Sequence, residues 1–347
     1  MTPNKTFIYK KPPTGVPVAG EHIVVEDRSI DLEQAPPQGG LVVEIINASF
    51  DPYLRGKMRD PAVKSYSPAF QLDEGITSGT VSRVLKSDAP GFQEGDLVVT
   101  YVPIAEYARV SKEALAMTTK IQNPHNLDLG LFLGPLGMPG LTAWSGLHKI
   151  GKPQKGETIF VSSAAGAVGQ VVGQIAKREG LTVIGSVGSD EKLDYITKEL
   201  GFDAGFNYKT EKPGDALPRL APEGIDIYFE NVGGEHLEAA LANMKINGRI
   251  PVCGMINDYN TPFEKQKGIK GLIQLIARQV TMEGFLVGNP NFGPAYAKEQ
   301  QENLQKWLAD GSIKAKLHVT EGIENAPQGF VDMLTGKNFG KAVLKIR

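Results

Sequence analysis

The chain has 347 residues, which is more than one hydrophobic core usually holds and suits two domains. Its apolar fraction of 41% and charged fraction of 22% are ordinary for a folded globular protein. The formal net charge is -2 and no long run of one sign occurs, so nothing in the composition favours binding to nucleic acid or to an anionic membrane. We therefore expect a small molecule as the main partner.

No segment of the sequence has the character of a membrane span or a secretion signal. The longest apolar stretches, such as residues 129–141, are interrupted by glycine and proline and are shorter than the roughly 20 residues that cross a bilayer. The first residues, Met-Thr-Pro-Asn-Lys-Thr, are polar where a signal peptide is apolar. The sequence predicts a cytoplasmic protein.

The counts of cysteine and histidine bear on metal chemistry. Cys253 is the only cysteine, so an internal disulfide and a zinc site made of several cysteines are both impossible. The five histidines show no spacing typical of metal ligands, and we expect no metal site. Cys253 follows an apolar run and is expected to be a small buried side chain rather than a nucleophile. His148 and Trp144 share an apolar helical stretch and are expected to be structural.

The part of the chain up to about residue 119 is predicted to be β-rich. Short runs with many β-branched residues alternate there with clusters of glycine, proline, aspartate and asparagine. This spacing predicts a compact β domain, with strands at 22–26, 40–48, 77–85 and 96–102.

The pattern changes at residue 156 to short apolar runs that alternate with longer helical patterns, which is typical of βαβ units and a parallel sheet. Helix-period apolar positions occur at 167–179, 191–200 and 235–244. A doubly wound α/β fold follows from this alternation, with strands expected at 158–161, 182–187, 204–207, 225–230, 248–253 and 280–284.

The tail of the chain returns to strand-like runs. After a helix expected at 294–309, strands are expected at 316–319 and 341–346 with a helix at 322–334 between them. The chain is therefore expected to leave the β domain, build the α/β domain and come back. We place the β-rich domain at 1–135 and 312–347, and the α/β domain at 136–311.

One turn carries a specific chemical pattern. The apolar run 158–161 is followed by Ala164-x-Gly166-x-x-Gly169 and then by a helical pattern, which is the arrangement of a dinucleotide-binding turn. A side chain at Gly166 would hold the backbone away from a pyrophosphate, and one at Gly169 would push the helix off the strand. Ala164 replaces the usual first glycine, so an ordinary glycine-rich turn is the alternative. The strand before it and the helix after it favour the dinucleotide.

The next strand-to-helix turn bears on the choice between NADH and NADPH. An NAD enzyme usually has a carboxylate at the end of the second strand, where this chain has Val187 and Gly188. Lys192 and Tyr208 are instead placed to meet a 2′-phosphate, which favours NADPH. Ser189 can also serve simply as a helix N-cap, and Asp190 remains an alternative partner for a ribose 2′-hydroxyl.

Several further stretches match one protein family. They are 51–56 (Asp-Pro-Tyr-Leu-Arg-Gly), 137–143 (Gly-Met-Pro-Gly-Leu-Thr-Ala), 201–203 (Gly-Phe-Asp), 228–234 (Tyr-Phe-Glu-Asn-Val-Gly-Gly) and 336–341 (Gly-Lys-Asn-Phe-Gly-Lys). With the dinucleotide turn they resemble the medium-chain dehydrogenase/reductase superfamily. The resemblance covers nearly the whole chain and is closest to the zinc-independent alkenal/one reductases. That branch includes leukotriene B4 12-hydroxydehydrogenase/prostaglandin reductase and the plant double-bond reductases.

The resemblance implies a GroES-like β-rich catalytic domain, a Rossmann domain that binds NADPH, and a homodimer. The Gly-His-Glu zinc motif and the cysteine cluster of the zinc-dependent alcohol dehydrogenases are absent. The fifth loop has Ile256-Asn257-Asp258-Tyr259 where the family more often has Ile-Ser-Xaa-Tyr, yet Tyr259 still aligns. The cofactor-binding residues implied in this way are Met138, Thr142, Gly166, Ala167, Val168, Gly169, Ser189, Lys192, Tyr208, Asn231, Cys253, Gly254, Met255, Ile256, Tyr259, Phe285, Leu286, Val287 and Asn338.

The reaction implied by the resemblance is NADPH-dependent reduction of a carbon–carbon double bond conjugated to a carbonyl. A hydride added to the β-carbon leaves negative charge on the carbonyl oxygen, which needs a hydrogen-bond donor. Tyr259 is the first candidate for that role and Tyr53 the second, although Tyr259 could be an ordinary loop tyrosine and Tyr53 part of a simple turn. Quinone or allylic-alcohol oxidoreduction, and a non-catalytic NADPH sensor, remain as alternatives.

Overall fold

Two units make up the chain in the computed structural model, which describes residues 1–347. The first unit consists of Met1–Leu133 and Leu317–Arg347, and the second of Gly134–Lys316. The boundaries that we expected from the sequence lie at 135 and 312.

The first unit is a β-rich body to which the C-terminal tail contributes. It has a three-stranded sheet in the order β2-β1-β4, and a second sheet in the order β15-β16-β3-β5-β6-β8 with β7 paired to β3. The strands are β1 (Lys5–Tyr9), β2 (Ile23–Asp27), β3 (Leu41–Ser49), β4 (Glu74–Gly75), β5 (Thr77–Ser87), β6 (Leu97–Pro103), β7 (Tyr107–Val110), β8 (Thr119–Lys120), β15 (Leu317–Glu321) and β16 (Lys341–Lys345), and the helices are α1 (Tyr53–Gly56) and α9 (Ala326–Leu334).

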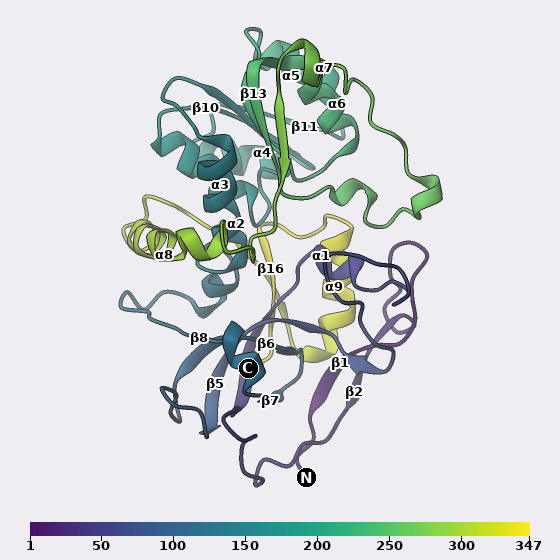
Figure 1. The fold of residues 1–347 in the computed structure, drawn as a ribbon, viewed down its shortest axis with the longest axis vertical. Helices are drawn as coiled ribbons and strands as arrows, with labels where there is room; N and C mark the ends of the chain where they lie inside the picture. Colours follow the sequence, from purple (N-terminus) through teal and green to yellow (C-terminus); the bar gives the residue numbers. More distant parts are fainter. The chain divides into compact units, whose positions relative to one another are not determined.

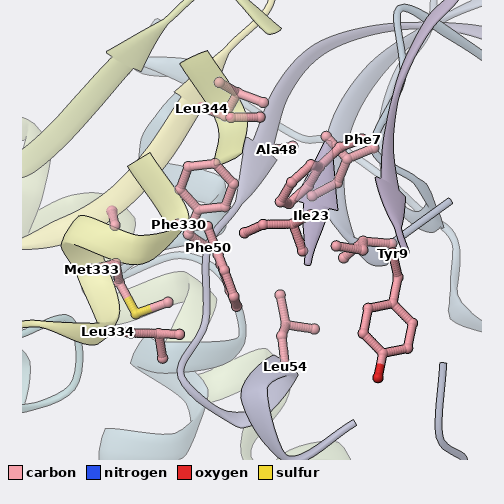
Figure 2. Close-up of a cluster of buried hydrophobic side chains, with 14 of the residues drawn as sticks. Phe7, Tyr9, Ile23, Ala48, Phe50, Leu54, Phe330, Met333, Leu334 and Leu344 are labelled. Atoms are coloured by element: carbon pink, nitrogen blue, oxygen red, sulfur yellow. The ribbon is translucent and has the colours of Figure 1, made fainter. Parts of the chain in front are cut away.

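Aromatic packing ties the two ends of the chain together within the first unit. Figure 2 shows the rings of Phe7, Phe50 and Phe330 gathered with aliphatic side chains of β3, α1, α9 and β16. Their centroids lie 5.9 to 6.3 Å apart in edge-on arrangements. Because Phe330 belongs to α9 and Phe7 to β1, the tail completes a core that the first 133 residues begin.

A buried ion pair lies beside this core. The Lys341 ammonium, at the start of β16, donates to Asp51 Oδ1 at 2.7 Å and to the carbonyl oxygen of Phe50 at 2.7 Å. Ser49 Oγ donates to the other oxygen of Asp51 at 2.5 Å. The exposed fraction of the side chain is 1% for Lys341 and 7% for Asp51, so neither charge has water as a substitute partner.

The second unit contains the predicted parallel sheet. Its strands run parallel in the order β11-β10-β9-β12-β13-β14, the order of a dinucleotide-binding fold. They are β9 (Thr158–Val161), β10 (Thr182–Val187), β11 (Ala204–Asn207), β12 (Ile225–Phe229), β13 (Met244–Val252) and β14 (Thr281–Gly284). The central strands are buried on both faces, which explains their nearly continuous apolar sequences.

Helices cover both faces of this sheet (Figure 1). They are α2 (Met138–Gly146), α3 (Gly169–Arg178), α4 (Asp190–Asp194), α5 (Pro213–Leu220), α6 (Gly234–Asn243), α7 (Gln274–Ala277) and α8 (Gly293–Ala309). The strand order reverses between β9 and β12, so the crevice at the carboxyl ends of these two strands is where this fold binds ligands. No helix in the structure combines the length and apolar character that a membrane crossing requires.

The Lys341–Asp51 pair gives a test of the first unit. Replacing Lys341 by alanine leaves the Asp51 carboxylate buried without its cation, and we expect the free energy of unfolding to fall by about 3–5 kcal/mol. Lys345→Ala is the control, since its ammonium lies on the same strand in an exposed pair 3.7 Å from Glu321. That change should cost less than about 0.5 kcal/mol. Urea denaturation measures both, and equal losses would contradict the role given to the buried pair.

Candidate active site

The turn between β9 and α3 is shaped by close backbone packing. A Cβ atom at position 169 would lie 2.3 Å from the carbonyl oxygen of Ser163, and one at position 166 would lie 3.0 Å from the same oxygen. A Cβ atom at 169 would overlap the backbone, so Gly169 is required sterically by this turn, whereas one at 166 would only be in tight contact with Ser163.

No side chain caps the start of α3, although the Gln170 amide donates to the Gly166 carbonyl at 3.1 Å and the Val171 and Val172 amides donate to the Val168 carbonyl at 3.0 Å. Its N-cap residue is Val168, whose side chain makes no hydrogen bond, and no acidic residue lies in the first turn. The first amide groups of a helix carry partial positive charge and have no acceptor inside the helix. This end of α3 therefore has the character of an anion site, and Ala167 and Val168 lie on the approach to it.

Ala164 is tolerated in place of the usual first glycine because of a glycine opposite it. Ala164 is fully buried and its amide donates to the carbonyl oxygen of Ser186 on β10 at 2.9 Å. A Cβ atom at Gly185 would lie only 2.7 Å from the methyl group of Ala164. The space that the first glycine leaves in other turns is thus provided here by Gly185.

The end of β10 is closed to a carboxylate. A Cβ atom at Gly188 would lie 2.9 Å from the hydroxyl oxygen of Tyr208, so the tyrosine occupies the space of a larger residue. The Tyr208 ring meets the buried His236 ring edge-on, with centroids 5.3 Å apart. Burial lowers the pKa of His236 to about 4, so its imidazole is neutral near pH 7 and supports Tyr208 without adding charge.

Two lysines lie in the same corner. Burial lowers the pKa of Lys192, and the positive charge of Lys209 lowers it further. Ser189 is the N-cap of α4, where its hydroxyl accepts from the Lys192 amide at 3.3 Å. Asp190 accepts from the Asn207 side-chain amide at 2.9 Å. Lys192 and Lys209 bring positive charge to this corner, where Asp190, at the start of α4, accepts from an amide and Glu191 lies beside Lys192.

A second turn follows β12 and meets the first. The Asn231 side-chain amide donates to the carbonyl oxygen of Ser162 at 2.8 Å, and the Asn231 backbone amide donates to Ser162 Oγ at 3.0 Å. Gly233 and Gly234 have φ of 80° and 52°, which glycine adopts at little cost. Added Cβ atoms there would lie 3.0 Å from Met255 and Asn257 respectively. The turn is thus held close to the loop that follows β13.

That loop contains Tyr259. The amides of Cys253 and Gly254 donate to the carbonyl oxygen of Glu230 at 2.9 and 3.2 Å, and that of Ile256 donates to Asn231 at 3.3 Å. The Tyr259 hydroxyl lies 2.9 Å from the position of a Cβ atom on Gly254. Burial raises the pKa of the Cys253 thiol to about 12, which is that of an unreactive thiol.

Other residues expected at the cofactor lie on α2 and after β14. Thr142 Oγ1 donates to the Met138 carbonyl at 2.8 Å, so both residues share one turn of α2. The Phe285 ring packs closely on Gly146, since a Cβ atom added there would lie only 2.5 Å from the ring. The same ring stacks on Phe292, with centroids 5.1 Å apart. The residues after it differ in exposure, since Leu286 is exposed and Val287 half-buried.

Two of the expected residues belong to the first unit. Tyr53 lies at the start of α1, and its hydroxyl is hydrogen-bonded to that of Ser78. Burial raises the pKa of Tyr53, and the charge of Asp51 raises it further, so this phenol keeps its proton near pH 7. Asn338 precedes β16, where its side-chain amide donates to the Gly340 carbonyl at 2.8 Å.

The structure has no cluster of metal-ligating side chains, and His148 makes packing contacts. No group of three or more histidine, cysteine, aspartate or glutamate side chains lies where it could hold a metal ion. His148 Nε2 lies 2.6 Å from Glu179, and its ring packs on Trp144 with centroids 4.8 Å apart. Trp144 in turn stacks on Trp307 of α8. These contacts join α2, α3 and α8, as expected of structural residues.

Three residues of interest carry no assignment from the sequence: Ser162, Lys209 and Glu230. Glu230 lies within the family-matching stretch 228–234, Ser162 directly follows β9, and Lys209 lies two residues after β11, so all three lie near the carboxyl ends of strands. That position is the signal by which they could have been found.

Gly169 gives a test of the turn. Gly169→Ala should lower the free energy of unfolding by about 1–3 kcal/mol, because its methyl group overlaps the Ser163 carbonyl. Gly214→Ala on α5 is the control, since a Cβ atom there has nothing within 4 Å. It should be neutral or stabilising by up to about 1 kcal/mol. Urea denaturation of both variants decides, and a neutral Gly169→Ala would contradict the packing described.

Comparison with known proteins supports the resemblance noted from the sequence. The family described as zinc-binding dehydrogenase matches residues 167–304, and the N-terminal domain of oxidoreductase matches residues 5–118. The NADP-dependent oxidoreductase RED1 of Cochliobolus heterostrophus is 51% identical over 346 residues, with 100% of this chain and 98% of that protein covered.

Two further relatives carry more specific names. The 2-alkenal reductase (NADP(+)-dependent) of Nicotiana tabacum is 41% identical over 348 residues, with 99% of this chain and 97% of that protein covered. The crystal structure of CurA in complex with NADPH, from Vibrio vulnificus, has a TM-score of 0.89 and 35% identity, with 99% of both chains covered. The predicted fold class, a GroES-like domain with a Rossmann domain, is confirmed. The chain belongs to the medium-chain dehydrogenase/reductase superfamily, within its group of NADP-dependent oxidoreductases.

Proposed function

We propose that the protein reduces the carbon–carbon double bond of α,β-unsaturated aldehydes and ketones with NADPH as the hydride donor. The observation that carries the proposal is the match along 99% of the chain to an enzyme named 2-alkenal reductase (NADP(+)-dependent). The name of RED1 and the NADPH complex of CurA support the same cofactor.

The second unit fits NADPH in two places. The glycine turn and the uncapped start of α3 suit a pyrophosphate, because the backbone there is bare and the helix end favours an anion. Lys192, Lys209 and Tyr208 suit the 2′-phosphate, since an anion between the lysines relieves their mutual repulsion. A ribose 2′-hydroxyl would instead need a carboxylate, which Gly188 lacks; Asp190, which accepts from Asn207 at one oxygen, is the alternative partner.

The chemistry then rests on hydrogen-bond donors. NADPH, when bound, supplies a hydride, which adds to the electron-poor β-carbon of the acceptor. Negative charge collects on the carbonyl oxygen, where we assign the Tyr259 hydroxyl as donor and Tyr53 as a second candidate. Tyr53 suits donation rather than acid catalysis, because its raised pKa keeps the proton on the phenol. The proton for the α-carbon comes from Tyr259 or from water.

The reaction is tested by following NADPH absorbance at 340 nm with four acceptors or donors: an enal, an enone, a quinone and, with NADP+, an allylic alcohol. We expect turnover with the enal and the enone. Turnover with the quinone alone would contradict the proposal, and NADPH binding without any turnover would favour a sensor.

The same assay tests Tyr259. Tyr259→Phe should keep NADPH binding and lose about 10²-fold or more in kcat, the usual effect of removing a donor to a developing oxyanion. Tyr296→Phe on α8 is the matched control and should keep wild-type kcat.

Cofactor choice is tested at Lys192. Lys192→Ala removes a charge-assisted contact to the 2′-phosphate, and the dissociation constant for NADPH should rise at least about tenfold while that for NADH changes little. Lys198→Ala is the control, because this lysine lies six residues further on and its side chain is 70% exposed in a pair with Asp194. Titration of cofactor fluorescence gives both constants, and an unchanged ratio in Lys192→Ala would contradict the phosphate corner.

A further inference from the structure

Glu230 is a buried acid that the proposed chemistry does not use. It follows β12 directly, at the reversal of strand order beside β9, and its exposed fraction is 0%. A carboxyl group is rarely buried so completely unless it has partners that replace water. The contacts of its two oxygens therefore bear on why it is there.

One carboxyl oxygen gathers four hydrogen bonds, the longest of them from Ser162 Oγ at 3.5 Å. Oε1 accepts from the Tyr228 hydroxyl at 2.7 Å, from the Val232 amide at 2.6 Å and from the Gly233 amide at 2.8 Å. The two amides belong to the turn that leads into α6, so the side chain curls over and holds the backbone that follows it. Hydrogen bonds that backbone N–H groups donate to a carboxylate are among the stronger hydrogen bonds in proteins.

The other oxygen, Oε2, is buried and has no hydrogen-bond partner. Burial raises the pKa of Glu230, while the bonds from Gly233, Tyr228, Val232 and Ser162 oppose that shift. A glutamine would give the turn the same acceptor at Oε1 without a buried charge. The charge is thus a cost to the fold, whereas the acceptor is what the turn uses.

Glu230 and its neighbours join three segments. Its carbonyl oxygen accepts from the amides of Cys253 and Gly254, at the start of the loop that carries Tyr259. Its Oε1 shares the Tyr228 hydroxyl with Ser162 Oγ, which lies 3.1 Å from that hydroxyl and starts the dinucleotide turn. Its side chain fixes the amides next to Asn231, which is itself bonded to Ser162. All three segments end at the same crevice of the sheet.

We propose that Glu230 is a positioning residue for NADPH: its buried acceptor sets the 231–233 turn, and so holds Asn231 and the loop from Cys253 against the dinucleotide turn. The inference rests on the proposed function, which makes these segments the cofactor site. Glu230 acts through them and needs no contact with the cofactor. Its loss should weaken cofactor binding first, with turnover at saturating NADPH less affected.

Three variants test this role by NADPH fluorescence titration, with far-UV circular dichroism as the check on folding. Glu230→Ala should raise the dissociation constant about tenfold or more, and raise KM for NADPH more than it lowers kcat. Glu230→Gln should recover most of that loss, because its amide oxygen replaces the acceptor. Glu235→Ala, an exposed acid in the first turn of α6, should stay within about twofold of the wild type.

These measurements distinguish failure of the role proposed for Glu230 from failure of the proposed function. A folded Glu230→Ala with wild-type affinity would overturn the proposal, and so would a folded Glu230→Gln that binds as weakly as Glu230→Ala. If Glu230→Ala does not fold, Glu230→Asp takes its place with the same expectations, because the shorter side chain withdraws the acceptor from the amides. Failure of the wild type to bind NADPH would instead overturn the proposed function. Failure of the acceptor assays alone leaves this binding test intact.

Discussion

The close approach of α3 to the end of β9 is the constraint on which the second unit depends. The Ser163 carbonyl occupies the space of a side chain at 169, and the Phe202 ring lies 1.9 Å from the position of a Cβ atom on Gly173. Gly169 and Gly173 therefore let α3 lie directly on the turn at Ser163 and on the Phe202 ring. No side chain caps the helix there, so the positive end of its dipole lies at the carboxyl end of β9, where the strand order reverses.

Everything else at that crevice is arranged around the same turn. The turn after β12 is held to it by the hydrogen bonds between Asn231 and Ser162, and the loop after β13 is held to the β12 turn by backbone hydrogen bonds. Such bonds fix direction as well as distance, so they suit segments that must present particular groups to a ligand. They also fit a buried acceptor at Glu230, because the adjacent amides of Val232 and Gly233 both donate to its Oε1 and no apolar side chain provides an acceptor.

The sequence predicted most of the sheet and part of the site. Strands β9, β10 and β11 have the predicted bounds, because each is a short run bounded by turn-forming residues. Helix α5 was missed, since Pro213, Gly214 and Pro218 lie within eight residues and signal a loop. The Lys341–Asp51 pair could not be predicted, because its members lie 290 residues apart and only the fold brings them together. The same holds for Gly185 opposite Ala164, a contact between two strand ends.

Under the proposed function, cofactor choice rests on two features that act independently. The first is steric: the Tyr208 hydroxyl fills the space beside Gly188, so a carboxylate at that strand end would have to displace a ring that His236 supports. The second is electrostatic: Lys192 and Lys209 repel each other until an anion lies near them. Removing one feature leaves the other in place. The preference for a 2′-phosphate should therefore weaken in steps rather than reverse with a single substitution. To bind a ribose 2′-hydroxyl instead, the site would need both free space at the end of β10 and a carboxylate there.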